Sequence, residues 1–311
     1  MLPRPGGGPY NTAVALGRLG SPTAFCSRIS TDAFGEALLS GLRADGVDTT
    51  LVQRGPEPTT LAVASVGTDG SAGYGFYAQG TADRLFSLPD AFPDRVDAVS
   101  FGTCSLVLEP GASAYEALLR REAGRGAFTA LDPNIRAGLI PDPDAYRARF
   151  RSWLPHVSLL KLSVEDARWL AEGGGFRDLE TALRRWLAAG PSAVVLTGGG
   201  EGLRVLARAG RTARVAGEPD RYGPSAEVPV RSVSVPAAPV RVVDTIGAGD
   251  TVNAALLHRL AGHRALSPEG AAALDEAAWR DILRYAARAA AVTCSRAGAQ
   301  PPYAAELAEP A

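Results

Sequence analysis

The stretch Val242–Leu257, VVDTIGAGDTVNAALL, places three small residues between two aspartates, and an apolar helical pattern follows at once. Together with the β-forming residues before it, the stretch predicts a strand that runs into a glycine turn and then a helix. The backbone N–H groups of Gly247, Ala248 and Gly249 can then point inward and form an anion-binding site at a helix N-terminus. Taken alone, an ordinary glycine-rich turn explains the stretch equally well.

Asp250 is the second aspartate of this stretch and falls in the first turn of the predicted helix. The helix dipole favours an ionised carboxylate at that position, which suits a base that must accept a proton. An anion-binding turn beside a free carboxylate is what phosphoryl transfer to an alcohol requires. The stretch therefore predicts a phosphoryl-transfer site, with the plain turn as its alternative.

Strand and helix patterns alternate along most of the chain, and runs such as Ser192–Thr197 are apolar on both faces, as in buried parallel strands. This alternation predicts an α/β fold with a doubly wound sheet between two helical layers. From Thr49 to Gln79 the period changes to two, which predicts antiparallel hairpins. We expect one domain over residues 1–311, with residues 47–80 as a small β excursion from it.

The individual elements follow from periodicity and from capping signals. The predicted helices are Asn11–Leu19, with Asn11 near its N-cap, Phe34–Ala44, Ser113–Ala123, Pro143–Trp153, Val164–Ala171, Leu179–Ala189, Val252–Leu260 and Asp275–Thr293. The predicted strands outside the excursion are Thr23–Ile29, Asp97–Thr103, Ala127–Asn134, Val157–Ser163, Ser192–Gly199 and the run before the glycine turn.

Composition excludes several functional classes. The net charge of −1 gives no field that would favour nucleic acid or an anionic membrane, and no apolar run is long enough to span one. Lys161 is the only lysine, and its neighbours fit neither a Walker A loop nor a eukaryotic protein kinase. Three widely separated cysteines without metal-ligand spacing indicate reduced, mostly buried thiols of a cytoplasmic protein.

Further motifs occur in order along the chain: Gly6–Ala13 (GGGPYNTA), Ser30–Thr50, Phe76–Leu85, Leu108–Ala114, Leu131–Leu139 (LDPNIRAGL), Leu160–Asp166 (LKLSVED) and Cys294–Pro302. With Asp244–Asp250 (DTIGAGD), this series resembles the ribokinase-type (PfkB) carbohydrate kinases, and their fructokinase branch in particular. The resemblance runs from residue 6 to about residue 303.

The resemblance implies a ribokinase-like three-layer αβα fold with a small β lid, ATP as phosphoryl donor and a sugar hydroxyl as acceptor. By position, Asp250 would be the base, and Gly247, Ala248 and Gly249 the anion hole. The residues expected to face the sugar are Gly6, Gly7, Asn11, Asp32, Gly35 and Arg136. Those expected at the nucleotide are Ser163, Asp166, Thr197, Gly199 and Gly202. Asp244, Ile246 and Gly298 resemble a monovalent-cation loop suited to K⁺, and Glu165 would act on Mg²⁺ through the phosphates.

Residue patterns alone leave two of these motifs open. Taken alone, the Leu196–Gly202 loop (LTGGGEG) is better explained as a hairpin turn. For the Asp132–Arg136 motif, an Asx-type turn before a helix remains the alternative to a site residue cluster.

The chain departs from the family pattern at three places. Only MLPRP precedes the Gly–Gly turn, so the usual first strand is expected to be missing from this chain. The family's Asn-x-x-Glu element stands here as Ser163-Val-Glu-Asp, and Tyr10 occupies a position where small residues are common.

The leading hypothesis is an ATP-dependent sugar kinase of the fructokinase type, with a possible homodimer formed through the lid. One alternative is a kinase for another acceptor, such as 2-keto-3-deoxygluconate or a pentose. A second alternative is a non-catalytic member that binds sugar or nucleotide, for which the short N-terminus is the only support.

Overall fold

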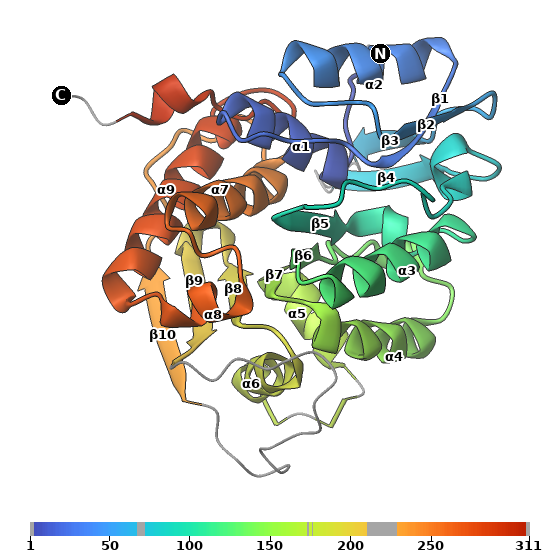
Figure 1. The fold of residues 1–311 in the computed structure, drawn as a ribbon. Coiled ribbons are helices and arrows are strands. Elements are labelled where there is room, and N and C mark those ends of the chain that lie inside the picture. The colour runs from blue at the N-terminus through green and yellow to red at the C-terminus, as the bar shows by residue number, and fades with distance from the viewer. Residues whose placement is uncertain (1–2, 67–71, 173, 176, 210–228, 309–311) are drawn as a thin grey trace.

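The computed structural model describes the whole chain except residues 1–2, 67–71, 173, 176, 210–228 and 309–311. Its main sheet has six strands in the order β10-β9-β8-β7-β6-β5 (Figure 1). Strands β5 to β8 are parallel, and β9 and β10 pair antiparallel at one edge. The strands of this sheet are β5 (Ala98–Gly102), β6 (Phe128–Asp132), β7 (Leu159–Ser163), β8 (Ala193–Thr197), β9 (Leu203–Arg208) and β10 (Val230–Val235).

Helices cover both faces of this sheet (Figure 1). The helices are α1 (Gly8–Arg18), α2 (Ala33–Ala44), α3 (Gly111–Gly124), α4 (Pro143–Trp153), α5 (Val164–Ala171), α6 (Leu179–Ala189), α7 (Ala248–Gly262), α8 (Pro268–Ala273) and α9 (Glu276–Cys294). Short 3₁₀ turns lie at Ala82–Leu85, Thr103–Leu106, Ala137–Leu139, Leu154–His156, Gly199–Glu201 and Ala304–Leu307.

Alternating side chains divide the interior into two cores. On β7, Leu159 packs with residues of α7 and α9, whereas Leu160 packs on the opposite face with residues of α3 to α6. Trp279 lies in the first core and Trp153 in the second, and both are fully buried. The period-two alternation of a strand thus produces the predicted three layers, helix–sheet–helix.

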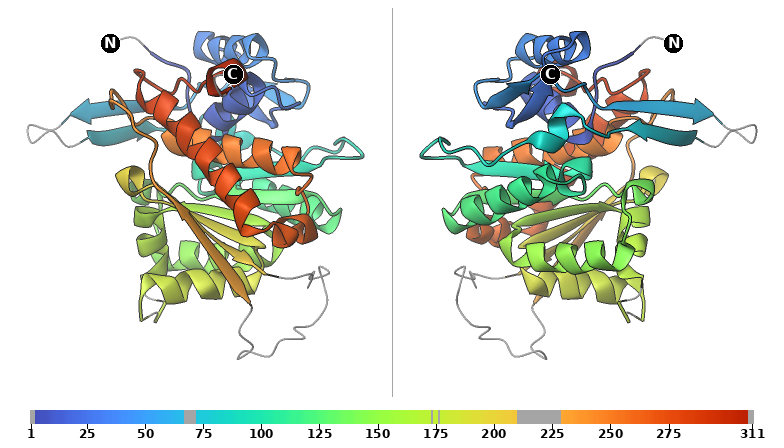
Figure 2. Two further views of the ribbon diagram at one scale, coloured as in Figure 1. Left: turned by 90° about the vertical axis from the view of Figure 1, so that its left-hand side faces the viewer. Right: turned by 90° about the vertical axis from the view of Figure 1, so that its right-hand side faces the viewer.

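The N-terminal part of the chain adds two small sheets above this body. β1 (Ser27–Ser30) and β2 (Val52–Gly55) pair in parallel, with α2 as the crossover between them. β3 (Leu61–Val66) and β4 (Ala72–Tyr77) form an antiparallel hairpin that extends away from the rest of the molecule (Figure 2). The predicted β excursion is therefore half hairpin, because β2 pairs with β1 and not with β3.

The predicted strand before the glycine turn is wrong. Residues 236–247 form no strand, and Val242 and Val243 are each 59% exposed. The amide of Val243 donates to the carbonyl oxygen of Cys294 at the end of α9, at 2.8 Å. The last strand before the glycine turn is β10, which ends twelve residues before Gly247. It pairs with β9, and the sequence predicts neither of these two strands.

Other boundaries also differ from the prediction: α3 begins at Gly111 and α7 at Ala248, earlier than predicted. Helix α1 begins at Gly8, with Gly7 at φ 131° as its N-cap and a proline in its first turn. Asn11 is therefore inside the helix and not near its start, and its side chain is free to contact another element. The strand predicted over Thr23–Ile29 is shorter in the structure, where β1 begins at Ser27.

The three cysteines are predicted to be mostly buried. Each is half-buried in the structure, and none forms a disulfide.

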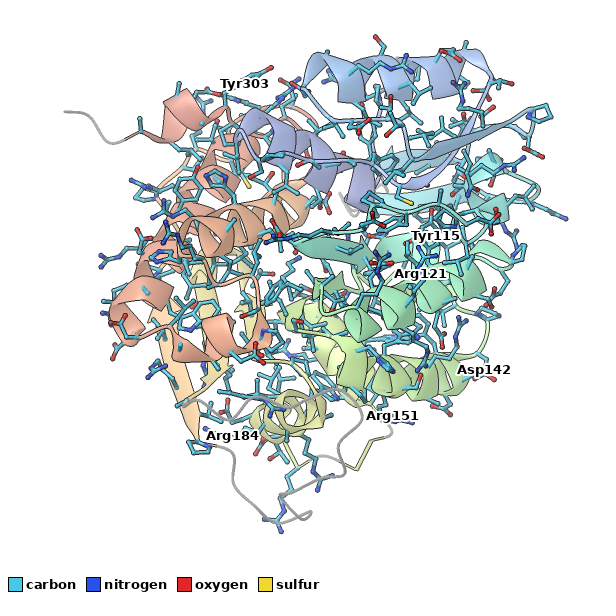
Figure 3. The ribbon with its side chains drawn as sticks, viewed as in Figure 1. Tyr115, Arg121, Asp142, Arg151, Arg184 and Tyr303 are labelled. Carbon is cyan, nitrogen blue, oxygen red and sulfur yellow. The ribbon has the colours of Figure 1, made fainter. Side chains whose placement is uncertain are left out.

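A large cavity separates the two-stranded β1–β2 sheet from the β5 edge of the main sheet. Within the described ranges no strand joins these two sheets. They are linked by Tyr115 of α3, whose hydroxyl lies 2.7 Å from Oγ of Ser27 and whose ring stacks on Phe86 (Figure 3). No helix among the described residues is both long and apolar enough to span a bilayer.

Candidate active site

The carboxyl ends of the parallel strands gather polar residues at one edge of the sheet. Gly102 of β5 lies in register with Asp132 of β6, and Ser163 of β7 with Thr197 of β8. In doubly wound sheets this edge is where ligands bind. The predicted polar motifs after β6, β7 and β8 are thereby brought to one side of the molecule.

The glycine turn predicted as the anion hole forms the start of α7. Gly247 is the N-cap residue, in the left-handed region at φ 79°, and a Cβ there would come within 2.6 Å of the Ala299 side chain. The helix begins at Ala248, so Gly249 and Asp250 occupy its first turn. The first amides of a helix have no intrahelical partner and carry the positive end of the helix dipole. Of these, the amide of Ala248 already donates to the carbonyl oxygen of Thr245 at 3.2 Å.

Asp250 is bound by a residue from the other end of the chain. Nδ2 of Asn11 in α1 donates to Oδ2 of Asp250 at 2.8 Å, and the two side chains are 8% and 7% exposed. Burial raises the pKa of Asp250 to about 6, because it outweighs the hydrogen bond from Asn11 and the nearby positive charges. Asp250 is therefore a buried carboxylate that can exchange a proton near neutral pH.

A cavity of about 1320 Å³ opens in front of this pair. The predicted site residues that line it are Gly6, Gly7, Asn11, Arg136, Ile246, Gly247, Gly249, Asp250 and Gly298. Gly247 and Gly249 of the predicted anion hole, the base and most of the predicted sugar contacts therefore face one space, whereas Ala248 is not among the lining residues. Arg136 adds a positive charge there, and its guanidinium is held by the side chain of Asn134 at 2.7 Å.

Asp32 and Gly35, both predicted to face the sugar, are not among the lining residues. Asp32 caps α2 by accepting from the amide of Gly35 at 2.7 Å, and it also accepts from the amide and hydroxyl of Thr59. A Cβ on Gly35 would come within 1.9 Å of the Ser30 carbonyl oxygen. Thr59 does line the cavity, so Asp32 reaches this space through Thr59.

Asp244 joins two loops below the cavity. Its Oδ1 accepts from the amide of Ile246 at 3.0 Å, and its Oδ2 accepts from the amide of Gly298 at 2.8 Å. Burial tends to raise the pKa of Asp244, but these amide hydrogen bonds outweigh burial and lower it. The three residues predicted as a cation loop are thus together, with both carboxylate oxygens already accepting hydrogen bonds.

Ser163 and Asp166 form a capping box at the start of α5. Oγ of Ser163 accepts from the amide of Asp166 at 2.9 Å, and Oδ2 of Asp166 accepts from the amide of Ser163 at 3.2 Å. Oδ1 of Asp166 accepts from the amide of Ile135, which fixes the loop that carries Arg136. Neither residue lines the cavity, and Glu165 is exposed.

The Leu196–Gly202 loop is the hairpin turn between β8 and β9. The amide of Gly198 donates to the carbonyl oxygen of Gly202 at 2.9 Å. Gly202 has φ 94°, and a Cβ there would lie 2.1 Å from the Val235 carbonyl oxygen, whereas Gly199 at φ 56° faces open space. Thr197, Gly199 and Gly202 lie beside Ser163 at the strand ends but outside the cavity in front of Asp250.

Sequence reasoning missed two features of the site. Lys161 and Asp132 form a buried ion pair of 2.8 Å behind the glycine turn. A charged residue inside the apolar strand LLKLS was the available signal, since a buried charge requires a partner. Thr103 and Asn134, which line the cavity, have φ angles of 58° and 43°. Backbone strain of this kind concentrates at functional sites but has no sequence signature here.

Among the residues that the structure describes, no cluster of three or more His, Cys, Asp or Glu side chains could hold a metal ion.

Comparison with known proteins places this site in context. Residues 3–306 match the family described as pfkB family carbohydrate kinase. A fructokinase from Rhizobium leguminosarum bv. trifolii is 39% identical over 284 residues, which cover 90% of this chain and 79% of the relative.

Solved structures of similar fold include two fructokinases. The structure from Xylella fastidiosa with bound ATP matches with a TM-score of 0.80 at 25% identity, over 97% of this chain and 89% of that one. The structure from Vibrio cholerae O395 with fructose, ADP and calcium matches with a TM-score of 0.78 at 24% identity, over 98% and 91%. The ribokinase-like fold predicted from the motifs is thereby confirmed.

Proposed function

Because this chain belongs to the pfkB family of carbohydrate kinases, we propose that it transfers the γ-phosphoryl group of ATP to a hydroxyl group of fructose. The chain is an ATP-dependent sugar kinase. The observation that carries the assignment of its site is the buried Asp250 beside the glycine turn of α7, facing the cavity. A non-catalytic binding member is not favoured, because both the carboxylate and the turn are in place.

Asp250 serves as the base of this reaction. The oxygen of the sugar hydroxyl attacks the γ-phosphorus, the bond from that phosphorus to the bridging oxygen of ADP breaks, and the hydroxyl proton passes to the Asp250 carboxylate. The hydrogen bond from Asn11 at 2.8 Å fixes one carboxylate oxygen, so the other is left for the proton. Burial strengthens Asp250 as a base by raising its pKa to about 6.

The turn of Gly247, Ala248 and Gly249 stabilises the charge that develops on the transferred group. Amides at a helix N-terminus are fixed donors and need no reorganisation during the reaction. Gly247 orients them by adopting the left-handed conformation at φ 79°, which other residues adopt rarely. Arg136, which lines the same cavity, adds a positive charge.

The acceptor occupies the cavity between α1, the β3 end of the lid and the turn of α7. Gly6, Gly7 and Asn11 are the proposed sugar contacts on one side and Arg136 on the other. Asp32 and Gly35 act indirectly, through the position of Thr59. A panel of fructose, other hexoses, pentoses and 2-keto-3-deoxygluconate, tested by ADP release, identifies the acceptor; a higher kcat/KM for any of the others would replace fructose.

The nucleotide occupies the ends of β7 and β8 near Ser163 and Thr197, where Gly199 provides backbone that a ligand can approach closely and Gly202 lets the loop pack against Val235. Glu165, the exposed carboxylate at the start of α5, would help to hold a Mg²⁺ ion that binds together with ATP. When bound, it neutralises charge on the β- and γ-phosphates. Calorimetric ADP affinity with and without Mg²⁺, in wild type and Glu165→Gln, tests this placement.

The loop of Asp244, Ile246 and Gly298 is the proposed K⁺ site. It fits such an ion in part, because Asp244 brings a carboxylate to the place where the two loops meet, although both oxygens of Asp244 accept amide hydrogens. An increase of the melting temperature in KCl over the same concentration of tetramethylammonium chloride, lost in Asp244→Asn, supports the assignment. Equal melting temperatures in the two salts would contradict it.

Asp250→Asn tests the catalytic assignment. The amide cannot accept the hydroxyl proton, so we expect kcat to fall by at least about 10²-fold, the lower range for loss of a general base. Asp178→Asn is the matched control, because Asp178 is an exposed cap of α6 and does not line the cavity. Circular dichroism and melting curves establish that both variants fold. Normal turnover by folded Asp250→Asn would refute the role of Asp250.

We also propose a homodimer that forms through the lid. Leu61 and Tyr77 are partners across the β3–β4 hairpin and are 39% and 67% exposed. An exposed apolar pair on an extended hairpin is a surface that a second copy can cover.

A further inference from the structure

Lys161 is the only lysine of the chain and is almost completely buried. It stands on β7 between Leu160 and Leu162, whose side chains pack into the second core. Its Nζ donates to Oδ2 of Asp132 on β6 at 2.8 Å, and the two side chains are 4% and 6% exposed. Removing an ion pair from water is unfavourable, so a fully buried pair requires an explanation beyond stability.

The position of Nζ connects this pair to the glycine turn. A Cβ built on Gly249 would lie 3.0 Å from Nζ of Lys161, so the ammonium group lies directly against the first turn of α7. A glycine at residue 249 leaves the space that the ammonium occupies. The other carboxylate oxygen of Asp132, Oδ1, is buried without a hydrogen-bond partner. The hydrogen bond from Lys161 is therefore the contact that balances the charge of Asp132.

We propose that Lys161 is a positioning residue for phosphoryl transfer, a fixed positive charge that keeps Asp250 ionised and adds to the field of the α7 N-terminus at the anion hole. The proposal rests on the proposed function of this site. Lys161 forms and breaks no bond during turnover and keeps its proton throughout; Asp132 holds the ammonium in place.

The charges around Asp250 support this role. The groups that face it are Asn11 from α1, Asp132 from β6, Lys161 from β7 and Arg136 from the loop after β6. Burial raises the pKa of Asp250 most, Asn11 lowers it, Asp132 raises it, and Lys161 and Arg136 each lower it by less than Asp132 raises it. Burial tends to lower the pKa of Lys161, but Asp132, Asp250 and Asp166 outweigh burial and raise it, so the group stays charged. Burial would otherwise hold Asp250 protonated, and Lys161 opposes that effect.

A purely structural ion pair is the competing explanation, and the acid limb of the kcat/KM profile separates the two. Lys161→Met should move that limb to higher pH by roughly one unit, the lower end of the effect of an opposite charge on a carboxylate. Asp132→Asn should move it to lower pH. A structural pair would change the amount of folded protein without moving the limb in opposite directions.

The kinetic experiment compares folded variants. Lys161→Met should lower kcat about 10²-fold, as for loss of one anion-hole group, with the KM for sugar nearly unchanged. If the Lys161→Met protein does not fold because Asp132 is left buried without a partner, the double variant Lys161→Met/Asp132→Asn removes both charges. Its acid limb should then lie above that of Asp132→Asn alone. Lys161→Arg, which keeps the charge, should return the limb toward wild type.

Arg147→Met is the matched control. Arg147 is 8% exposed and pairs with Glu172 at 2.9 Å, away from the cavity. Its loss should reduce stability and leave the acid limb in place. The proposal would be overturned if the acid limb of Lys161→Met lay at the wild-type pH. It would equally be overturned if the double variant and Asp132→Asn had their acid limbs at the same pH.

A second measurement requires no turnover, so the inference can fail independently of the proposed function. Protein produced with ¹³C-labelled lysine carries a single labelled side chain, because Lys161 is the only lysine. Its Cε signal should report a charged ammonium from pH 5 to 9 and a smaller inflection as Asp250 titrates, which Asp250→Asn removes. A Lys161 signal that is insensitive to Asp250 would refute the coupling, whereas absent sugar phosphorylation by wild type would refute the function alone.

Discussion

Asp250 combines two properties that oppose each other at the level of a single residue. Burial makes it a stronger base, but an ionised carboxylate in that environment destabilises the folded state. The folded pKa of about 6 lies above the reference value of 3.8. Since the native state then binds more protons between these values, the free energy of unfolding falls as pH rises from about 4 to 6, and it stays reduced above pH 6.

Asp250→Asn should therefore be more stable than wild type at pH 7.5 while it is inactive. The shift from 3.8 to about 6 corresponds to at most roughly 3 kcal/mol. The difference should disappear near pH 4, where wild-type Asp250 is itself protonated. Urea unfolding curves at pH 4 and 7.5 measure both values.

Asp244→Asn provides a control of opposite sign for that experiment. The amides of Ile246 and Gly298 bind the ionised form, which lowers the pKa of Asp244 despite its burial. Its ionised carboxylate thus stabilises the fold above the unfolded pKa, and this contribution is lost as pH falls. The variant should be less stable than wild type at pH 7.5. A loss of stability in Asp250→Asn at that pH would contradict the account of Asp250, and a gain of stability in Asp244→Asn would contradict that of Asp244.

At the level of elements, the sequence predicts what local signals determine. Helices α5 and α6 have the predicted bounds, because Ser163 and Asp178 cap them by hydrogen bonds within the same four residues. The strand predicted before Gly247 does not form. Val242 and Val243 favour β structure, but no neighbouring strand pairs with them, and pairing is a tertiary property.

The start of α1 shows how a site overrides a local signal. Asn11 is a good N-cap residue, yet the helix begins three residues earlier at Gly8, and the Asn11 amide is used to bind Asp250. The sequence contains both residues but not their contact, since they are 239 positions apart.

Asp32 joins two elements, and its removal tests whether the lid depends on it. As the N-cap of α2 it should contribute about 1 kcal/mol, and it also holds Thr59, which leads into β3. Asp32→Ala should reduce stability, raise the KM for sugar and speed hydrogen exchange in β3 and β4.

Asp178→Ala is the matched variant for this test, because Asp178 caps α6 by an equivalent bond to Thr181 and touches no part of the lid. It should lose similar stability with an unchanged KM. Equal KM values in the two variants would mean that Asp32 is a helix cap only.

At the level of the whole molecule, the site exists because the two ends of the chain meet. Residues 6–11 line one cavity together with several residues between Thr245 and Ala299. Outside the cavity, Tyr303 near the C-terminus donates to Asp45 at 3.0 Å and lies beside Arg18 of α1 (Figure 3). The members of the site could be named from motifs. Lys161 could not, because its role depends on the three-dimensional position of Gly249.

The β3–β4 hairpin links the oligomeric state to the sugar site, because it carries both the exposed apolar pair and residues that line the cavity. If Leu61 and Tyr77 are covered by a second copy, wild type should sediment as a dimer and Leu61→Ser/Tyr77→Ser as a monomer, because the substitutions replace an apolar contact with polar side chains. Leu88→Ser is the control, since Leu88 is 38% exposed outside the hairpin and should leave the dimer intact. Thr60 and Leu61 also line the cavity, so the monomeric variant should show a raised KM for sugar as well. A wild-type monomer at micromolar concentration would exclude the dimer, and a monomeric variant with unchanged KM would separate assembly from sugar binding.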